Sequence, residues 1–101
     1  MKYYSPEDVV SPKDYVKNVE VIFNGGEKSF SLAKLDWNGS PQLAIRWNVS
    51  EREWEDEEKI DGKKTCAGLP SSHGYPVWFV LPQTVFDKNT NAGKAILKAF
   101  K

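Results

Sequence analysis

Apolar and polar residues alternate most clearly over residues 42–49. Leu43, Ile45, Trp47 and Val49 occupy every second position, with polar or small residues between them. A period of two predicts a β-strand with one buried face. The preceding Asn-Gly-Ser-Pro at residues 38–41 favours a chain reversal, so this strand is expected to form the second arm of a hairpin.

Two earlier segments extend the pattern. Residues 15–23 alternate in the same way, and Asn24-Gly25-Gly26-Glu27 predicts a turn into a second strand over residues 28–37. Loops of two or four residues would place the larger apolar side chains on one face, which we expect to be the core: Val19, Val21, Phe30, Leu32, Trp47 and Val49. The other face would carry Ser31, Ala33, Leu35, Trp37, Gln42, Ala44, Arg46 and Asn48. A three-residue loop at Asn38 would instead send Ala33 and Leu35 to the core.

The C-terminal third predicts one further strand and a helix. Residues 77–81 are wholly apolar, which is typical of a strand covered on both faces. Residues 82–86 favour one helical turn, and residues 91–101 form an amphipathic pattern whose apolar stripe needs a sheet or a partner to cover it. The predicted fold is therefore α+β, with a four-stranded antiparallel sheet of two hairpins followed by a C-terminal helix.

The domain organisation follows from these elements. A chain of 101 residues fits one domain. Residues 1–14 contain two Ser-Pro steps and are expected to form a loosely ordered arm that packs through Val9 and Val10. Residues 15–101 then form the single α+β domain, with a long acidic and Gly/Pro-rich loop at 51–76.

Charge is balanced overall but segregated along the chain. The 14 basic and 14 acidic residues give a net charge of zero, yet residues 51–58 hold six acids and one arginine. The remainder carries 13 basic and 8 acidic residues, a balance of +5. A basic face and an acidic loop can therefore coexist, and the acidic run is expected to be a solvated charged loop.

Several functional classes find no support in the sequence. One cysteine, Cys66, and one histidine, His73, exclude an internal disulfide and a Cys/His zinc site. As a catalytic pair they lack a third, orienting group, and no phosphate-binding glycine motif is present. No apolar run reaches membrane-spanning length and no signal peptide is evident. We therefore expect a cytoplasmic, non-enzymatic protein without metal or cofactor.

Aromatic and basic residues point instead to single-stranded nucleic acid. Trp37 and Arg46 lie on the face opposite the expected core, and Lys63 and Lys64 lie in a nearby loop. Aromatic rings stack on bases and cations neutralise phosphates in such sites. Alternatively, Trp37 is covered in a second small core beneath the arm or the helix. For Trp47 the alternation favours burial.

The segment from Leu35 to Trp47 resembles a hairpin of the YdbC-like bacterial branch of the transcriptional coactivator positive-cofactor-four family. Trp37, Asn38 and Arg46 match that motif, with a one-residue gap in the turn, and Trp47 lies one position earlier than the family tryptophan. The resemblance implies a strongly curved four-stranded sheet, a helix-mediated homodimer and single-stranded DNA bound on the sheet. The connection over residues 51–75 is much longer than in the family, and the helix starts late.

The sequence therefore predicts a single-stranded DNA or RNA binding protein, such as an accessory factor in transcription or replication. Its predicted contacts are Trp37, Asn38, Arg46, Trp47, Lys63 and Lys64. The alternative is a protein-interaction module in which acidic residues 51–58 recognise a basic partner.

Overall fold

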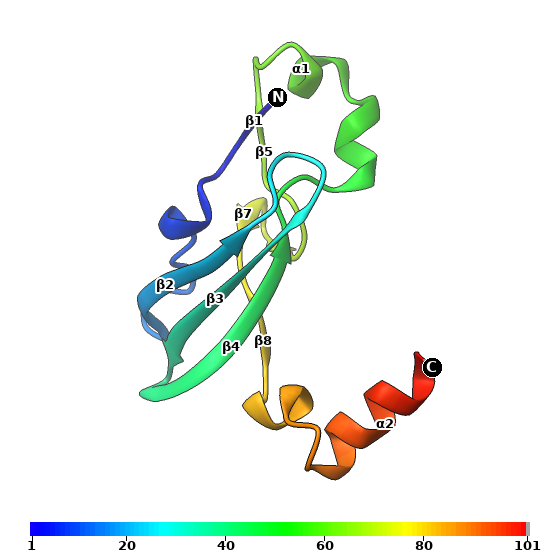
Figure 1. Ribbon diagram of the computed structural model, residues 1–101. Helices are drawn as coiled ribbons and strands as arrows, with labels where there is room; N and C mark the ends of the chain where they lie inside the picture. Colours follow the sequence, from blue (N-terminus) through cyan, green and yellow to red (C-terminus); the bar gives the residue numbers. More distant parts are fainter. Residues whose placement is uncertain (101) are drawn as a thin grey trace.

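The computed structural model describes residues 1–100 and shows an α+β fold (Figure 1). Its central sheet is antiparallel with the order β2-β3-β4-β8. The strands are β2 (Val16–Asn24), β3 (Phe30–Trp37), β4 (Ser40–Trp47) and β8 (Phe79–Leu81), and the helix α2 (Asn91–Ala99) follows. The predicted fold class is thus confirmed at this level. The strong curvature implied by the family resemblance is not confirmed.

The long connection after β4 is folded into short elements. The 3-10 helix η2 (Glu51–Glu55) leads into α1 (Glu57–Ile60), and β5 (Thr65–Cys66) pairs in parallel with β1 (Lys2–Tyr3). A small hairpin follows, formed by β6 (Ser71–Ser72) and β7 (Tyr75–Pro76). Two further 3-10 helices complete the chain, η1 (Pro6–Asp8) in the arm and η3 (Gln83–Phe86) before α2.

The turn between β3 and β4 fixes which side chains share a face. Trp37 pairs with Ser40, so the loop is the two residues Asn38 and Gly39, both with positive φ of 49° and 87°. This is the conformation that two-residue hairpins favour. Phe30 therefore lies opposite Trp47 on one face, as the predicted loop length requires. Strand β2 is less regular, with register shifts on either side of Val21.

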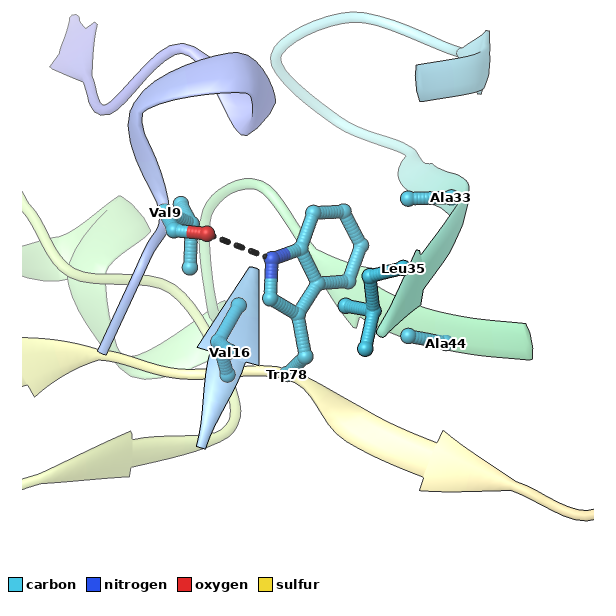
Figure 2. Close-up of a cluster of buried hydrophobic side chains, with 6 residues drawn as sticks. All are labelled: Val9, Val16, Ala33, Leu35, Ala44 and Trp78. Atoms are coloured by element: carbon cyan, nitrogen blue, oxygen red, sulfur yellow. Dashed lines mark hydrogen bonds between the residues drawn. The ribbon is translucent and has the colours of Figure 1, made fainter. Parts of the chain in front are cut away.

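The prediction of which face forms the core is wrong for β3 and β4, although two of the expected core residues, Val49 and Val19, are respectively buried and packed against the core. Ser31, Ala33, Leu35, Ala44, Arg46 and Asn48, which were expected outside it, are all 0–2% exposed. The apolar cluster under this face also contains Val9 and Val16, with Trp78 from the segment before β8 (Figure 2). We call this side of the sheet the covered face. The two-residue loop was among those expected, so the error lies in the face chosen and not in the spacing.

Trp78 explains why small residues form the core. Its indole lies against Ala33, Leu35 and Ala44 in Figure 2 and is only 5% exposed. Alanines leave room for a ring of this size, and close packing is then reached with side chains from outside the sheet. The indole Nε1 donates a hydrogen bond to the carbonyl oxygen of Val9 at 2.7 Å. The arm thus packs through Val9, as expected, whereas Val10 is 38% exposed.

Helix α2 extends away from the sheet in Figure 1, with η3 as its main neighbour. The Thr90 side chain caps it by accepting from the backbone N–H of Gly93 at 3.0 Å. Ile96, Leu97 and Phe100 are 43–87% exposed, so the apolar stripe predicted from the sequence is largely uncovered. Within residues 1–100, no helix is long and apolar enough to span a bilayer.

Candidate nucleic-acid interface

The opposite side of the sheet, which we call the open face, carries the larger apolar side chains. One row crosses all four strands, because Phe23 pairs with Leu32, Leu32 with Ile45, and Ile45 with Phe79. Phe23, Trp47 and Phe79 are 45%, 52% and 57% exposed. The face predicted to be the core is therefore an accessible aromatic surface. The open face also carries Phe30, Leu43 and Leu81, together with the charged residues Lys17, Glu20, Lys34 and Asp36.

Three aromatic rings on this face are in contact. The ring centroids of Phe23 and Phe30 are 5.2 Å apart, and those of Phe30 and Trp47 are 5.9 Å apart with planes at 83°. Such tilted and edge-to-face arrangements are favourable between aromatic rings. Together they hold an apolar surface in place over β2, β3 and β4.

Trp47 separates two hollows of about 500 Å³ each. Phe30, Leu69 and Phe79 line one of them, which is mostly apolar. The other is lined by Trp54 and Leu69 and also by the charged residues Lys28, Glu51 and Arg52. The Lys28 ammonium lies 5.7 Å from the centroid of the Trp54 ring, within cation–π range. Aromatic and cationic groups therefore meet beside Trp47.

Arg46, the neighbour of Trp47, points to the covered face and is 2% exposed. Its guanidinium donates hydrogen bonds to the carbonyl oxygens of Ala67, Pro70 and Val77. Burial lowers the pKa of Arg46 to about 10, and the nearby Glu53 carboxylate opposes that shift, so the group stays charged at neutral pH. The side chain thus ties the loop segment to the sheet. In this position it is not exposed to a phosphate, contrary to the role expected from the sequence.

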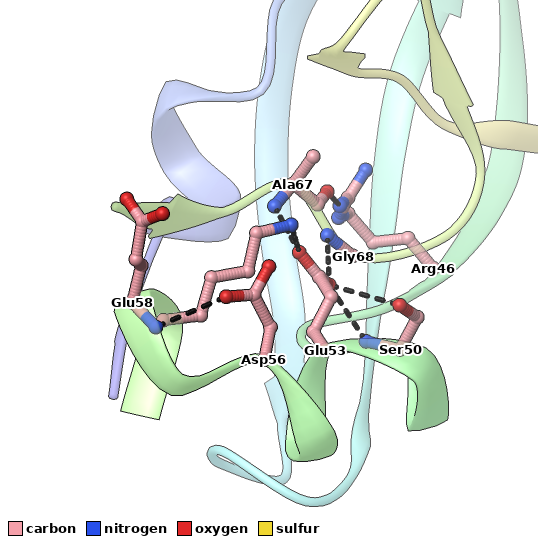
Figure 3. A network of polar contacts seen from close by, with 8 residues as sticks. Arg46, Ser50, Glu53, Asp56, Glu58, Ala67 and Gly68 are labelled. Atoms are coloured by element: carbon pink, nitrogen blue, oxygen red, sulfur yellow. Dashed lines mark hydrogen bonds and ion pairs between the residues drawn. The ribbon is translucent and has the colours of Figure 1, made fainter. Parts of the chain in front are cut away.

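Glu53 is a buried acidic residue close to Arg46 and to the loop at Ala67 and Gly68 (Figure 3). Although it belongs to the acidic run, it is 6% exposed and accepts hydrogen bonds from the backbone N–H groups of Ser50, Ala67 and Gly68, each at 2.9 Å. Lys59 forms an ion pair with it at 2.7 Å. Burial by itself would raise the pKa of Glu53, but the hydrogen bonds from Lys59, Ser50 and Gly68 outweigh burial and lower it to about 2.

The expectation of a solvated charged loop is therefore wrong for Glu53. Residues 51–60 form η2 and α1, and Glu53 links them to residues 67 and 68. A Cβ at Gly68 would collide with the Trp47 carbonyl oxygen, so this close approach needs glycine. The remaining glutamates of the run are exposed, at positions 51, 55, 57 and 58.

The other predicted contacts are spread over the molecule. Trp37 is half-buried on the covered side, where its ring stacks on Tyr15 at 5.5 Å, and Asn38 is exposed in the adjacent turn. Lys63 and Lys64 are exposed after α1, at the other end of the molecule in Figure 1, and Lys64 pairs with Glu58 at 3.3 Å. Trp37 and Trp47 occupy opposite faces. The six residues thus do not form one site.

Within residues 1–100, neither a catalytic Cys-His pair nor a metal-binding cluster is assembled. Cys66 is fully buried in β5, whereas His73 is exposed in the turn between β6 and β7. Over residues 1–100, no group of three or more His, Cys, Asp or Glu side chains is placed to hold a metal ion.

Comparison of the chain with protein-family models, with curated proteins and with solved structures found no match. The functional argument therefore rests on the molecule itself. Sequence reasoning missed Phe23 and Phe30 as accessible residues, because their alternation with polar residues was taken as the mark of a buried face. The prediction that residues 77–81 are covered on both faces is wrong for Phe79, which is 57% exposed.

Proposed function

We propose that this protein binds single-stranded nucleic acid on the open face, with Trp47 as the central stacking residue. The observation that carries the proposal is the aromatic surface of the sheet, where Phe23, Trp47 and Phe79 are exposed and Phe30 lies between the rings of Phe23 and Trp47. Bases stack on such platforms irrespective of sequence, with about 1–3 kcal/mol per base. An exposed apolar surface of this kind marks a binding surface in a folded protein.

Cations at the edges of the open face would neutralise the phosphates. Lys28 and Arg52 line the hollow beside Trp47, and Lys34 is exposed on the open face opposite Leu43. The proposal assigns the phosphate contacts to these three residues and gives Arg46 a structural role.

The proposed function is tested with a labelled single-stranded oligonucleotide, measured by fluorescence anisotropy at two salt concentrations. Trp47→Ala should weaken binding by about tenfold, since one lost stacking contact of 1–3 kcal/mol corresponds to at least a fivefold change. Phe86→Ala is the matched control, because Phe86 is similarly exposed at 58% but lies in η3. Wild-type affinity should also fall as salt rises.

Two results would contradict the proposal. Absence of saturable binding at micromolar concentrations would exclude this ligand class. Equal affinities of the Trp47 and Phe86 variants would place the contact elsewhere on the molecule.

Self-association through α2 is part of the proposal. Ile96, Leu97 and Phe100 expose apolar surface that a second copy of the helix can cover. Leu97→Glu should convert a dimer to a monomer in light scattering coupled to gel filtration. A wild-type chain that is monomeric at all concentrations would contradict the self-association and leave the proposal of nucleic-acid binding standing.

A second candidate function is recognition of a basic protein by the acidic segment. The exposed carboxylates of Glu51, Glu55, Glu57 and Glu58 favour it, because η2 and α1 present them on an ordered surface. Under this function, Glu55→Gln with Glu57→Gln would weaken binding of a lysine-rich peptide, and Trp47→Ala would not. Under nucleic-acid binding, the same double variant binds the oligonucleotide at least as well as the wild type.

A further inference from the structure

A third hollow, of about 530 Å³, lies on the covered side of the sheet, away from Trp47. Residues of three separate segments line it: the arm, the end of β3, and the segment from β6 to Trp78. Trp37 and Trp47 lie on opposite faces of the sheet. Trp37 ends β3, whereas Trp47 lies in β4 beside Phe30, the first residue of β3. The seven residue steps of that strand span about 23 Å. The hollow is thus a separate site from the open face. Its principal lining residues are Ser11, Trp37, Ser72, His73, Tyr75 and Trp78.

Local structure fixes the aromatic walls. Trp37 ends β3 immediately before the two-residue turn and is stacked on Tyr15, with ring planes 23° apart. Trp78 is anchored by its hydrogen bond to Val9. Tyr75 is positioned by the β6–β7 hairpin, where it pairs with Ser72. His73 and Gly74 form the turn of that hairpin with φ of 51° and 81°, again the two-residue type.

The lining combines aromatic rings with neutral polar groups. Trp37, Tyr75 and Trp78 supply ring surfaces, while Ser11 and Ser72 supply hydroxyls that both donate and accept hydrogen bonds. Of the residues that the structure describes, no Asp, Glu, Lys or Arg lines the hollow. A flat, uncharged ring with hydrogen-bonding edges fits this chemistry, whereas a phosphate would find no Lys or Arg here.

We propose that this hollow binds a single nucleobase, stacked on Trp37 and Tyr75 and hydrogen-bonded at its edge by the serine hydroxyls. The inference deepens the proposed function by adding a base site on the side away from the open face. The base can belong to a free nucleoside or to an unstacked nucleotide of a bound strand, because both offer the same ring. Tyr75 is 64% exposed and lies outside the core, so it can be changed without disturbing the fold.

The test follows the four tryptophan indole N–H signals by ¹⁵N NMR in the full chain during titration with adenosine. The Trp37→Phe variant assigns the Trp37 signal, and the hydrogen-bonded Trp78 indole reports that the fold is intact. Adenosine should shift the Trp37 signal saturably, whether or not the Trp47 signal also responds. Tyr75→Ala should weaken this response about tenfold, with Phe86→Ala unchanged.

Other probes distinguish the source of the base and the nature of the site. A single-stranded oligonucleotide that shifts both Trp37 and Trp47 supports a base from a bound strand, whereas a shift of Trp47 alone leaves a free nucleoside as the ligand. No Trp37 response to adenosine would overturn the inference, as would a response to tetramethylammonium alone, which indicates an aromatic cage for cations. If adenosine binds at Trp37 but no oligonucleotide binds at Trp47, the function proposed for the open face fails and this site stands.

Discussion

The two faces of the sheet differ most clearly between neighbouring residues. Arg46 is 2% exposed and Trp47 is 52% exposed; Trp78 is 5% exposed and Phe79 is 57% exposed. In each pair the first side chain lies on the covered side of the sheet and the second on the open face. The covered face includes small and polar residues, and the open face carries large apolar ones. Burial here depends on what the rest of the chain places over a face, and not on hydrophobicity alone.

The largest expected effect comes from Trp78. Trp78→Ala should lower the free energy of unfolding by about 3–5 kcal/mol, because it empties the space over Ala33 and Ala44 and leaves the Val9 carbonyl unpaired. Phe79→Ala, one residue later, should cost less than about 1 kcal/mol. Urea unfolding of both variants measures the difference. Similar losses of unfolding free energy in the two variants would show that the covered and open faces contribute equally to stability.

Arg46 gives the next largest effect on the covered side. Arg46→Ala should cost about 3 kcal/mol, because it removes the buried cation that donates to three loop carbonyl oxygens and leaves those oxygens without their partner. Trp47→Ala should change the stability far less and act on oligonucleotide binding instead. Thermal unfolding and anisotropy, measured on the same two proteins, separate these roles. An Arg46 variant of wild-type stability would show that the guanidinium is dispensable to the fold.

Lowering the pH should reduce the free energy of unfolding through protonation of Glu53. Its pKa in the folded chain, about 2, lies below the ordinary value of 4.5, so the unfolded chain takes up the proton first. The stabilisation is therefore complete above about pH 4.5 and is lost as the pH falls towards 2. Glu53→Gln should lower stability at neutral pH and flatten this acid dependence, whereas Glu55→Gln at an exposed position should alter neither. Unfolding free energies between pH 2 and 6 provide the measurement.

The smallest effect on stability is expected on the open face at Phe23. Phe23→Ser removes a ring that is 45% exposed and contacts Phe30, so the loss should stay near 1 kcal/mol or below. Oligonucleotide affinity should fall in the same variant if the aromatic surface extends to β2. A large loss of stability would instead show that Phe23 supports the sheet.

The sequence predicts the four strands of the central sheet and the turn at Asn38-Gly39, because those depend on neighbouring residues. The alternation around Trp47 and the Asn-Gly pair at 38–39 each carry their own structural signal. The choice of face depends on long-range contacts that alternation does not encode. Trp78 lies 34 residues after Ala44, and its position over that residue follows from the folding of the intervening segment.

The candidate site was predicted only in part for the same reason. Trp47 was named as a contact and is exposed, but the pattern around it favoured burial. Arg46 resembles a phosphate-binding residue in the sequence, and only the loop carbonyls that surround it reveal a structural role. Glu53 is one of six acids in eight residues, and its sequence neighbours give no sign that it alone is buried.

The hydrogen bond from Trp78 to Val9 also bears on how the chain folds during its synthesis. It joins residues 69 positions apart, so the core cannot close until Trp78 has left the ribosome. Before that point, the strands β2 to β4 are already available to pair, with both of their faces unprotected. The nascent chain therefore exposes an apolar sheet from the emergence of β4 until that of Trp78, an interval in which a chaperone that recognises such surfaces can act on it.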